Sequence, residues 1–297
     1  MAGLAEASEF IASTAAKAGD AVVGLGPGWR GGSGVVVADG RVLTASHNLR
    51  RDQVSVVFAD GRRERAELLG VDRDVDLAVL AVDTAGIEPI PVAAGAADAD
   101  GARGIGALVV GLARPGGRSL RVTHGFVSTD QRQMRGPRGR RIPAIEHTAP
   151  LPRGSSGGPL LDADGKLIGV NVIRLDGGLI VAVDTVALAG DIERLGRGEA
   201  PTRRRLGVAV APPHVARRLR RSVGLPDATG ILVRGVEDGS PAAEAGLERG
   251  DLLVELDGIA LERIDDLYNA LDANSDGLSL GVLRGADRRD VRIEFRS

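Results

Sequence analysis

Cysteine is absent from this chain and aromatic residues are rare. Without cysteine the chain has no disulfide, no thiolate zinc site and no cysteine nucleophile. Aromatic residues amount to 2% of the chain, which argues against surfaces that stack nucleic-acid bases and against aromatic cages for cations. Lysine is also scarce, with only Lys17 and Lys166, so arginine is the ordinary cation of this sequence.

A strong net charge and long apolar runs are missing as well. The formal net charge is −2, so no overall field draws the chain toward nucleic acid or an acidic membrane. No window approaches the roughly 18 uninterrupted apolar residues of a membrane-spanning helix, and the N-terminus has no basic segment followed by an apolar run. We therefore expect no membrane partner and a cytoplasmic protein. A secreted or membrane-anchored parent protein from which the signal or anchor had been trimmed would show the same features.

What the chain does have is enough length and apolar content for two domains. It has 297 residues, of which 43% are hydrophobic and 26% are charged, a balance typical of globular proteins with a substantial core. Residues 4–18 have the spacing of an amphipathic helix. The expected apolar face of that helix consists of Leu4, Ala5, Phe10, Ile11 and Ala15.

Short β-type runs separated by glycine, aspartate and asparagine turns follow this helix. Asp39-Gly40 and Asp60-Gly61 stand between such runs, where a tight hairpin turn needs a positive φ. A linker at 93–103 divides the runs into two sets of similar size, which predicts two packed barrels. The expected strands are 21–26, 34–38, 41–45, 54–58, 66–71 and 76–83, then 107–111, 120–128, 144–148, 159–162, 167–173 and 179–183.

A helix at 185–196 and a Gly/Pro/Arg-rich boundary at 197–205 precede a smaller α+β domain. Ser240 is the expected cap of a short helix that has Pro241 in its first turn. The expected helices of this domain are 215–223, 240–245 and 264–271, and the expected strands are 230–236, 252–256, 278–283 and 291–295. The predicted organisation is a helical segment 1–20, a first domain 21–197, a linker 198–204 and a second domain 205–297.

Three segments carry residues suited to catalysis. His47 ends a hydrophobic strand, Asp74 or Asp76 opens a buried strand, and Ser155 or Ser156 lies in a glycine-rich turn before a strand. A serine hydroxyl becomes a nucleophile when a base takes its proton, and an imidazole held by a carboxylate can do so near neutral pH. Glycines beside the serine let backbone N–H groups converge into an oxyanion hole. The order His, Asp, Ser is that of two-barrel serine proteases, not of subtilisins or α/β-hydrolases.

These segments resemble the HtrA (DegP-like) family of trypsin-like serine proteases. The matching stretches are GSGVVVADGRVLTASHNL, DVDLAVLAV and GSSGGPLLDADGKLIGVN, and the resemblance covers roughly residues 20–297. It implies a mainly β fold, with a chymotrypsin-like double β-barrel protease domain followed by a small α+β PDZ domain.

Residue by residue, the resemblance implies His47 as general base, Asp76 as orienting acid and Ser156 as nucleophile. The family's sequence frame selects Asp76 over Asp74 and Ser156 over Ser155. The expected oxyanion donors are the backbone amides of Gly154, Ser155 and Ser156. No metal or organic cofactor is expected.

The strand at 179–183 stands where the family places the strand beside the P1 pocket. The resemblance therefore suggests Ile180, Val181 and Ala182 as substrate-binding residues. Because this run contains no acid, we expect a small or medium apolar P1 side chain and disfavour a basic one.

The C-terminal domain resembles a bacterial-type PDZ domain. The similarity is carried by RLGV at 205–208, GSPAAEAGL at 239–247 and RGDLLVELDG at 249–258. Such domains bind a peptide as an added strand at a sheet edge. The expected peptide-binding residues are Leu206, Gly207, Val208, Leu267 and Leu271, the first three to receive a C-terminal carboxylate and the two leucines to contact an apolar terminal residue. The alternative is that both leucines are core residues.

Two segments depart from the family pattern. His147-Thr148-Ala149-Pro150 replaces an Asp-containing run, and the segment at 111–116 replaces the usual Gly-Asn-Pro. Both would shape the loops of the activation domain, so a resting inactive state stays open. Phe10 and Trp29 are the candidate aromatic residues for a homotrimer near the N-terminus.

The remaining histidines and the arginine clusters are expected to be structural or solvated. His124, His147 and His214 lack the spacing of a metal site. Arginines concentrate at 132–141 and 217–221, where a mobile surface loop and a solvated helix face are favoured over a nucleic-acid partner.

The sequence thus predicts a serine endopeptidase acting on unfolded or damaged proteins and peptides through an acyl-enzyme. The PDZ domain would bind peptide tails or regulate activity. The alternative is a catalytically weak or inactive peptide-binding chaperone or adaptor on the same scaffold.

Overall fold

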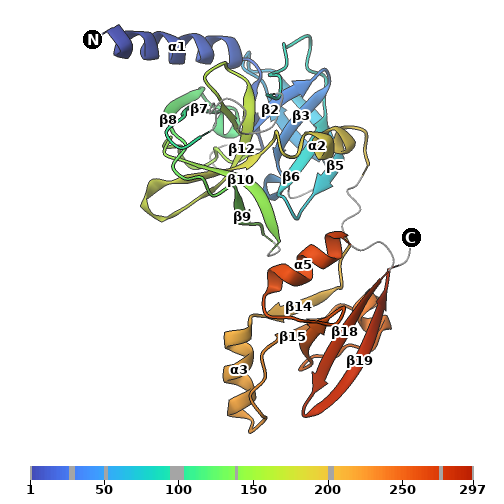
Figure 1. Ribbon diagram of the computed structural model, residues 1–297. Coiled ribbons are helices and arrows are strands. Elements are labelled where there is room, and N and C mark those ends of the chain that lie inside the picture. The colour runs from blue at the N-terminus through green and yellow to red at the C-terminus, as the bar shows by residue number, and fades with distance from the viewer. Residues whose placement is uncertain are drawn as a thin grey trace. The chain divides into compact units, whose positions relative to one another are not determined.

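The chain folds into two compact units that divide between residues 201 and 202, inside the stretch predicted as a linker (Figure 1). The computed structural model describes residues 2–26, 31–49, 53–93, 104–137, 140–199, 204–273 and 277–295. Among these residues, no helix combines the length and apolar character that crossing a bilayer would need.

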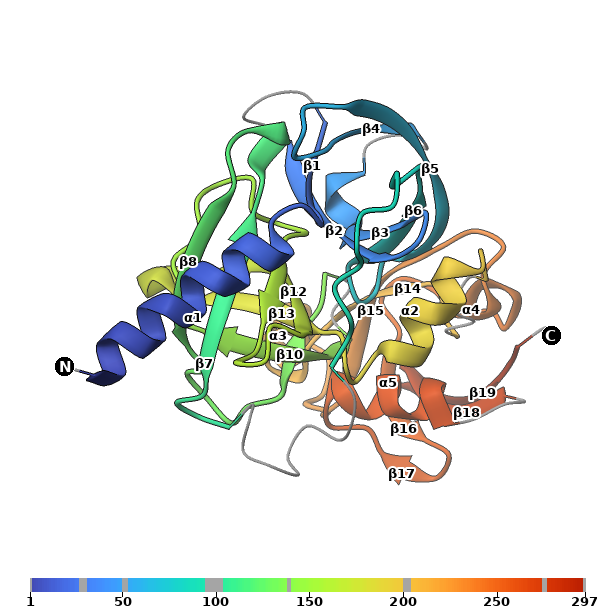
Figure 2. The ribbon, with the colours of Figure 1, turned by 90° about the horizontal axis from the view of Figure 1, so that it is seen from above.

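The first unit begins with a closed antiparallel barrel, seen end-on in Figure 2. Its strands are β1 Val22–Leu25, β2 Gly32–Ala38, β3 Arg41–Ala45, β4 Gln53–Val57, β5 Arg63–Asp72 and β6 Leu77–Ala81, in the order β1-β2-β3-β6-β5-β4. Valine and leucine side chains fill its interior, including Val35, Leu43 and Leu80. Gly40 and Gly61 have φ of 66° and 89°, which confirms the two tight turns predicted at those positions.

A second antiparallel sheet follows in the same unit. Its strands are β7 Leu108–Ala113, β8 Arg121–Phe126, β9 Gln133–Arg135, β10 Arg141–His147, β11 Pro159–Leu161, β12 Leu167–Arg174 and β13 Ile180–Asp184, in the order β8-β7-β11-β12-β13-β10-β9. A bridge between Val127 and His147 joins the end of β8 to β10 and closes the sheet on itself. This architecture confirms the predicted mainly β, double-barrel fold.

Two helices flank these barrels. In α1 (Ala2–Ala18), Phe10, Ile11 and Ala15 pack against the first core, as expected, whereas Ala5 is exposed and not part of the buried face. In α2 (Ala189–Gly196), Ile192 and Leu195 are buried. Trp29 and Leu4, two side chains named in the sequence predictions, lie outside the described side chains.

The second unit is a small α+β domain. Its sheet runs β14-β15-β16-β18-β19, with β17 paired to β16. Ser240 caps α4, because its Oγ accepts a hydrogen bond of 3.2 Å from the N–H of Ala243, which confirms the predicted cap. The elements are β14 Val208–Ala211, α3 Pro213–Ser222, β15 Ile231–Val236, α4 Pro241–Glu244, β16 Leu252–Leu256, β17 Ile259–Ala260, α5 Ile264–Ala273, β18 Gly277–Arg284 and β19 Asp287–Glu294.

Candidate active site

The structure brings His47 and Asp76 into direct contact. His47 lies in the short 3₁₀ turn η2 (Ser46–Asn48), and its Nδ1 is 2.6 Å from Oδ2 of Asp76. The other carboxylate oxygen accepts hydrogen bonds from Ser46 Oγ at 2.8 Å and from the His47 N–H at 2.9 Å. The Asp76 side chain is 5% exposed and that of His47 is 46% exposed. A buried acceptor of this kind holds Nδ1 protonated and leaves the Nε2 lone pair free to take a proton.

Asp76 adopts an uncommon backbone conformation to make these contacts. Its φ is 60°, in the left-handed region that costs a non-glycine residue about 1–2 kcal/mol. The Ser46 N–H donates to the Asp76 carbonyl at 3.0 Å, so backbone and side chain of Asp76 both bind the turn that carries His47. This strained conformation is maintained at the position where the carboxylate meets the imidazole.

Ser156 lies in the glycine-rich turn 154–158, which we call the serine turn. The turn is fixed to the first barrel through its carbonyl groups. Ser33 donates its N–H to the Ser156 carbonyl at 2.9 Å and its hydroxyl to the Gly154 carbonyl at 3.0 Å. Asn48, next to His47, donates to the Ser156 carbonyl at 2.8 Å. The two barrels therefore meet where His47 and Ser156 are held on adjoining turns.

Close packing explains one glycine of the serine turn. Gly157 has a φ of 88°, and a Cβ there would lie 2.0 Å from the Ser33 carbonyl oxygen and 2.3 Å from Thr44 Oγ1. Any larger residue would push the serine turn away from the barrel that carries His47.

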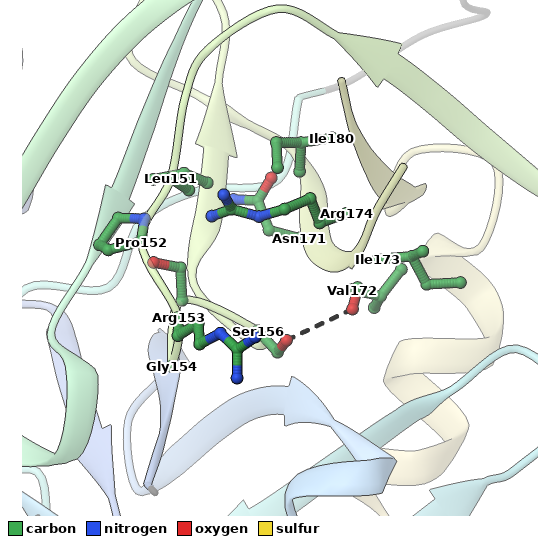
Figure 3. A pocket seen from close by; sticks show the side chains of 11 residues that line it. Leu151, Pro152, Arg153, Gly154, Ser156, Asn171, Val172, Ile173, Arg174 and Ile180 are labelled. Atoms are coloured by element: carbon green, nitrogen blue, oxygen red, sulfur yellow. Dashed lines mark hydrogen bonds between the residues drawn. The ribbon is translucent and has the colours of Figure 1, made fainter. Parts of the chain in front are cut away.

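The Ser156 hydroxyl does not bond to His47 in this structure. It donates to the carbonyl of Val172 at 3.3 Å, as the dashed line in Figure 3 marks. A rotation about the Cα–Cβ bond of Ser156 would redirect the hydroxyl. Catalytic hydrogen bonds are often unformed before substrate arrives.

The amide groups expected to bind an oxyanion belong to the serine turn. Within the described residues, the N–H groups of Gly154, Ser155 and Ser156 donate no hydrogen bond. The Ser155 carbonyl accepts from the Gly158 N–H at 2.9 Å, and because a trans peptide aligns C=O and N–H in opposite directions, the Ser156 N–H points the other way. These donors remain available to a ligand.

A pocket of about 350 Å³ opens beside the Ser156 hydroxyl (Figure 3). We call it the serine pocket. Of the three residues suggested by sequence, only Ile180 lines it. Val181 and Ala182 are buried within the sheet at 3% and 0% exposure and are not among its walls. The lining residues are Leu151, Pro152, Arg153, Gly154, Ser155, Ser156, Asn171, Val172, Ile173, Arg174 and Ile180.

Sequence reasoning missed the two arginines of the serine pocket. Arg153 immediately precedes the serine turn, and Arg174 ends β12, so they come from different segments. The strand at 179–183, from which the P1 preference is predicted, contains neither of them. The signal that could have found one of them is Arg153 itself, a basic residue directly before the serine turn in the sequence.

His147 is a buried structural residue next to the serine pocket. It is fully buried; its Nε2 lies 2.8 Å from Asn171 Oδ1, and its Nδ1 accepts from the Ala149 N–H at 3.2 Å. Burial lowers the pKa of His147 to about 4, against smaller opposing effects of the Asn171 hydrogen bond and of Glu146. The ring is therefore neutral at neutral pH and ties the 147–150 segment to the pocket wall at Asn171.

The segment 111–116, which replaces the family's usual Gly-Asn-Pro, contains a buried cation. Arg114 is 8% exposed and donates to the carbonyl groups of Val22 at 2.8 Å and Gly19 at 3.0 Å. Burial lowers the pKa of its guanidinium, opposed by Asp20. Its backbone N–H donates to Ser33 Oγ at 3.0 Å, which joins this segment to the hydroxyl that holds Gly154.

Two expectations for the arginine clusters were wrong in part. In the first cluster, β9 pairs antiparallel with β10, and Arg140 is 3% exposed with its Nε 3.9 Å from Asp74 Oδ2. Arg220 in the second cluster is 4% exposed and donates to the Pro226 and Gly285 carbonyls. Asp74 and Gly285 are distant in sequence from the arginines that they bind, so the pattern of the arginines alone could not reveal these two contacts. His124 and His214 are exposed, as expected.

In the second unit, the suggested peptide-binding residues occupy an edge strand and the core. β14 is an edge of the sheet, and within the described residues the N–H groups of Leu206 and Gly207 donate no hydrogen bond. Val208 begins β14. Leu267 and Leu271 on α5 are 3% and 5% exposed and belong to the core, so the core alternative describes both in this structure.

Comparison with known proteins finds a matching protein family for each of the two units. A profile described as trypsin-like peptidase domain matches residues 32–170, and one described as PDZ domain matches residues 232–284. The chain is 31% identical over 271 residues to a "Probable periplasmic serine endoprotease DegP-like" of Halomonas elongata, covering 88% of this chain and 55% of that protein. It is 32% identical over 282 residues to "Serine protease HTRA2, mitochondrial" of Drosophila pseudoobscura pseudoobscura, covering 88% and 65%.

A solved structure described as "HtrA-type protease AlgW with decapeptide" is also similar. The TM-score is 0.70 at 26% identity, with 96% of this chain and 97% of the other covered. The chain thus spans between half and two thirds of the length of these two curated relatives and nearly all of this structural neighbour.

Proposed function

The chain belongs to the HtrA (DegP-like) family of trypsin-like serine proteases with a PDZ domain, and on that premise we propose that it is a serine endopeptidase cleaving unfolded or damaged proteins. One observation carries the proposal. His47 Nδ1 lies 2.6 Å from a buried Asp76 carboxylate, on a turn whose Asn48 binds the Ser156 carbonyl.

In the proposed mechanism, Ser156 Oγ turns from the Val172 carbonyl toward Nε2 of His47. His47 takes the hydroxyl proton as Oγ attacks the substrate carbonyl carbon, and Asp76 stabilises the imidazolium. The N–H groups of the serine turn receive the negative charge that develops on the carbonyl oxygen. Losing one such donor typically costs about 10²–10³ in rate.

Collapse of the tetrahedral intermediate breaks the peptide C–N bond, and His47 gives its proton to the leaving amine. The acyl-enzyme then reacts with water. His47 takes a proton from that water, and a second collapse releases the carboxylic acid product and restores the Ser156 hydroxyl. No cofactor takes part in these steps.

The second unit is proposed to bind the C-terminal tail of a peptide. Support comes from the free edge of β14 and from the unpaired N–H groups of Leu206 and Gly207, which suit strand addition and capture of a carboxylate. The peptide-bound state named for the structural neighbour is consistent with this role. Contact of Leu267 or Leu271 with the peptide stays a prediction, since both are buried here.

The second candidate function is a peptide-binding chaperone or adaptor with weak or no turnover. The observation behind it is that the Ser156 hydroxyl donates to the Val172 carbonyl and not to His47. A nucleophile in this position describes an inactive protein as well as a resting enzyme, so an activity assay has to separate the two.

A digestion assay separates the two functions. The chain is incubated with casein, which is an unfolded substrate, and in parallel with a folded protein of similar size. We expect fragments from casein alone, and none with Ser156→Ala. If the wild-type chain and Ser156→Ala both suppress aggregation of a heat-denatured protein and neither yields fragments, with or without C-terminal peptides, the chaperone function holds and the endopeptidase proposal fails.

A homotrimer and a cytoplasmic location also stay proposals. Phe10, one of the two aromatic candidates, packs in part against the core of its own unit. Light scattering should give three times the 30.6 kDa chain mass if the trimer forms, and the chain mass itself if it does not.

A further inference from the structure

The serine pocket carries positive charge without a matching acid. Its eleven lining residues include Arg153 and Arg174 and no aspartate or glutamate. Neither arginine forms an ion pair or hydrogen bond within the described residues. The acid nearest to Arg174 in sequence, Asp176 in the following turn, forms no ion pair with it. Any acyl substrate at Ser156 therefore meets two uncompensated cations.

The two arginines approach the pocket from different sides. In Figure 3, the Arg174 side chain extends inward toward Leu151 and Asn171, and Arg153 lies near Ser156. Both side chains are exposed enough to adjust to a ligand. A guanidinium offers its N–H donors in a planar fork, which suits the two oxygens of a carboxylate.

The Asn171 amide, by contrast, is already engaged. Its Oδ1 is taken by His147, and its Nδ2 donates to the Gly158 and Pro159 carbonyls at 2.9 and 3.1 Å. Among the polar side chains of the pocket wall, the donors left for a substrate side chain are those of the two arginines.

We propose that Arg153 and Arg174 make the serine pocket selective for an acidic substrate side chain, so that the chain cleaves preferentially after glutamate or aspartate. This inference rests on the proposed endopeptidase function and narrows it. It replaces the apolar P1 preference expected from residues 179–183, because that expectation did not include either arginine. A basic side chain would meet like charge from two directions.

The test compares four otherwise identical fluorogenic peptides with Glu, Gln, Val or Lys at P1. Glu and Gln have nearly the same shape, so their ratio of kcat/KM isolates the charge. Exposed ion pairs each contribute roughly two- to fivefold, so we expect Glu to exceed Gln by about five- to tenfold, and Lys to be the poorest. The Glu/Gln ratio should fall as salt rises from 0.05 to 0.5 M, because the pairs are screened.

Arg174→Gln and Arg153→Gln should each lower the Glu/Gln ratio by about two- to threefold, and the double variant should bring it close to one. Arg65→Gln is the matched control, since Arg65 is an exposed arginine on β5 outside the pocket, and it should keep the wild-type ratio. A wild-type ratio at or below one, or a ratio unchanged in the double variant, overturns the proposal.

Binding separates this inference from the proposed function. The same peptides, bound to Ser156→Ala and followed by fluorescence anisotropy, should show the Glu preference in their dissociation constants without turnover. If wild-type protein cleaves none of the peptides, the endopeptidase proposal fails, whereas the Glu/Gln binding ratio still decides the role of the arginines.

Discussion

His147 should make the first unit lose stability as the pH falls below 6.5. The ring is fully buried between Asn171 and the Ala149 N–H, and desolvation lowers its pKa from 6.5 to about 4. In the unfolded chain the ring gains a proton below pH 6.5, whereas in the folded chain it does so only near pH 4. The unfolded state therefore binds more protons between these values, and the stability present above pH 6.5 is lost as the pH falls.

The magnitude follows from the distance between the two pKa values. At pH 5, an unfolded-state histidine is 1.5 units below its pKa of 6.5, and the folded ring is still mostly neutral. One pKa unit corresponds to about 1.4 kcal/mol, so this group alone should remove about 2 kcal/mol of folding free energy at pH 5 relative to pH 7.5.

Urea unfolding of wild type and His147→Gln at pH 7.5 and 5 measures this loss. Glutamine does not titrate, so the change in unfolding free energy between the two pH values should be about 2 kcal/mol smaller in the variant. His124→Gln, at an exposed histidine, should keep the wild-type pH dependence. Equal pH dependence of wild type and His147→Gln would refute the conclusion that the pKa of His147 is lowered in the folded chain.

Three further predictions follow from the site and the second unit. Asp76→Asn should lower kcat by about 10⁴-fold, because the amide favours the wrong His47 tautomer. Steady-state kinetics measure this loss, and an unchanged circular dichroism spectrum shows that the variant is folded. A near-normal kcat would contradict the triad. Gly157→Ala should lower the free energy of urea unfolding by about 3 kcal/mol or more, because the new methyl group clashes with Ser33 and Thr44 and the backbone is strained. Gly177→Ala is the control: its φ is 81° and no atom lies within 4 Å of the new methyl group, so it should lose only the strain energy. Equal losses in the two variants would refute the packing argument. Ser240→Ala should destabilise the second unit by about 1 kcal/mol through loss of the α4 cap, and an unchanged unfolding midpoint for that unit would contradict it.

The sequence predicted the elements whose pattern is local. Alternating apolar runs located the strands of both barrels, and glycines at Gly40 and Gly61 located their turns, because side-chain period and φ requirements act within a few residues. β9, β14 and β17 were not predicted. β14 is a short apolar strand, VAVA, in a segment that was interpreted only as part of the peptide-binding site. β9 is a three-residue strand in an arginine-rich segment and β17 has two exposed residues, so β9 and β17 carry no apolar pattern.

The site was predictable as a set of residue types and not as a set of contacts. His47, Asp76 and Ser156 stand in recognisable segments, and the structure brings the first two together. The charge of the serine pocket was not predictable from strand 179–183, because Arg153 and Arg174 reach it from other segments. Burial of Arg140 against Asp74 depends on the same kind of long-range packing, which a sequence pattern does not encode.

The most direct test of the account is covalent labelling of the nucleophile by a fluorophosphonate probe, followed by peptide mass mapping. Ser156 and Ser155 are neighbours in one turn, so the labelled position identifies the reactive hydroxyl and tests its activation by His47. We predict one label per chain on Ser156, absent in Ser156→Ala and in His47→Ala, and retained in Ser155→Ala. A label on Ser155, or no label on the wild-type chain with C-terminal peptides present, would contradict the account.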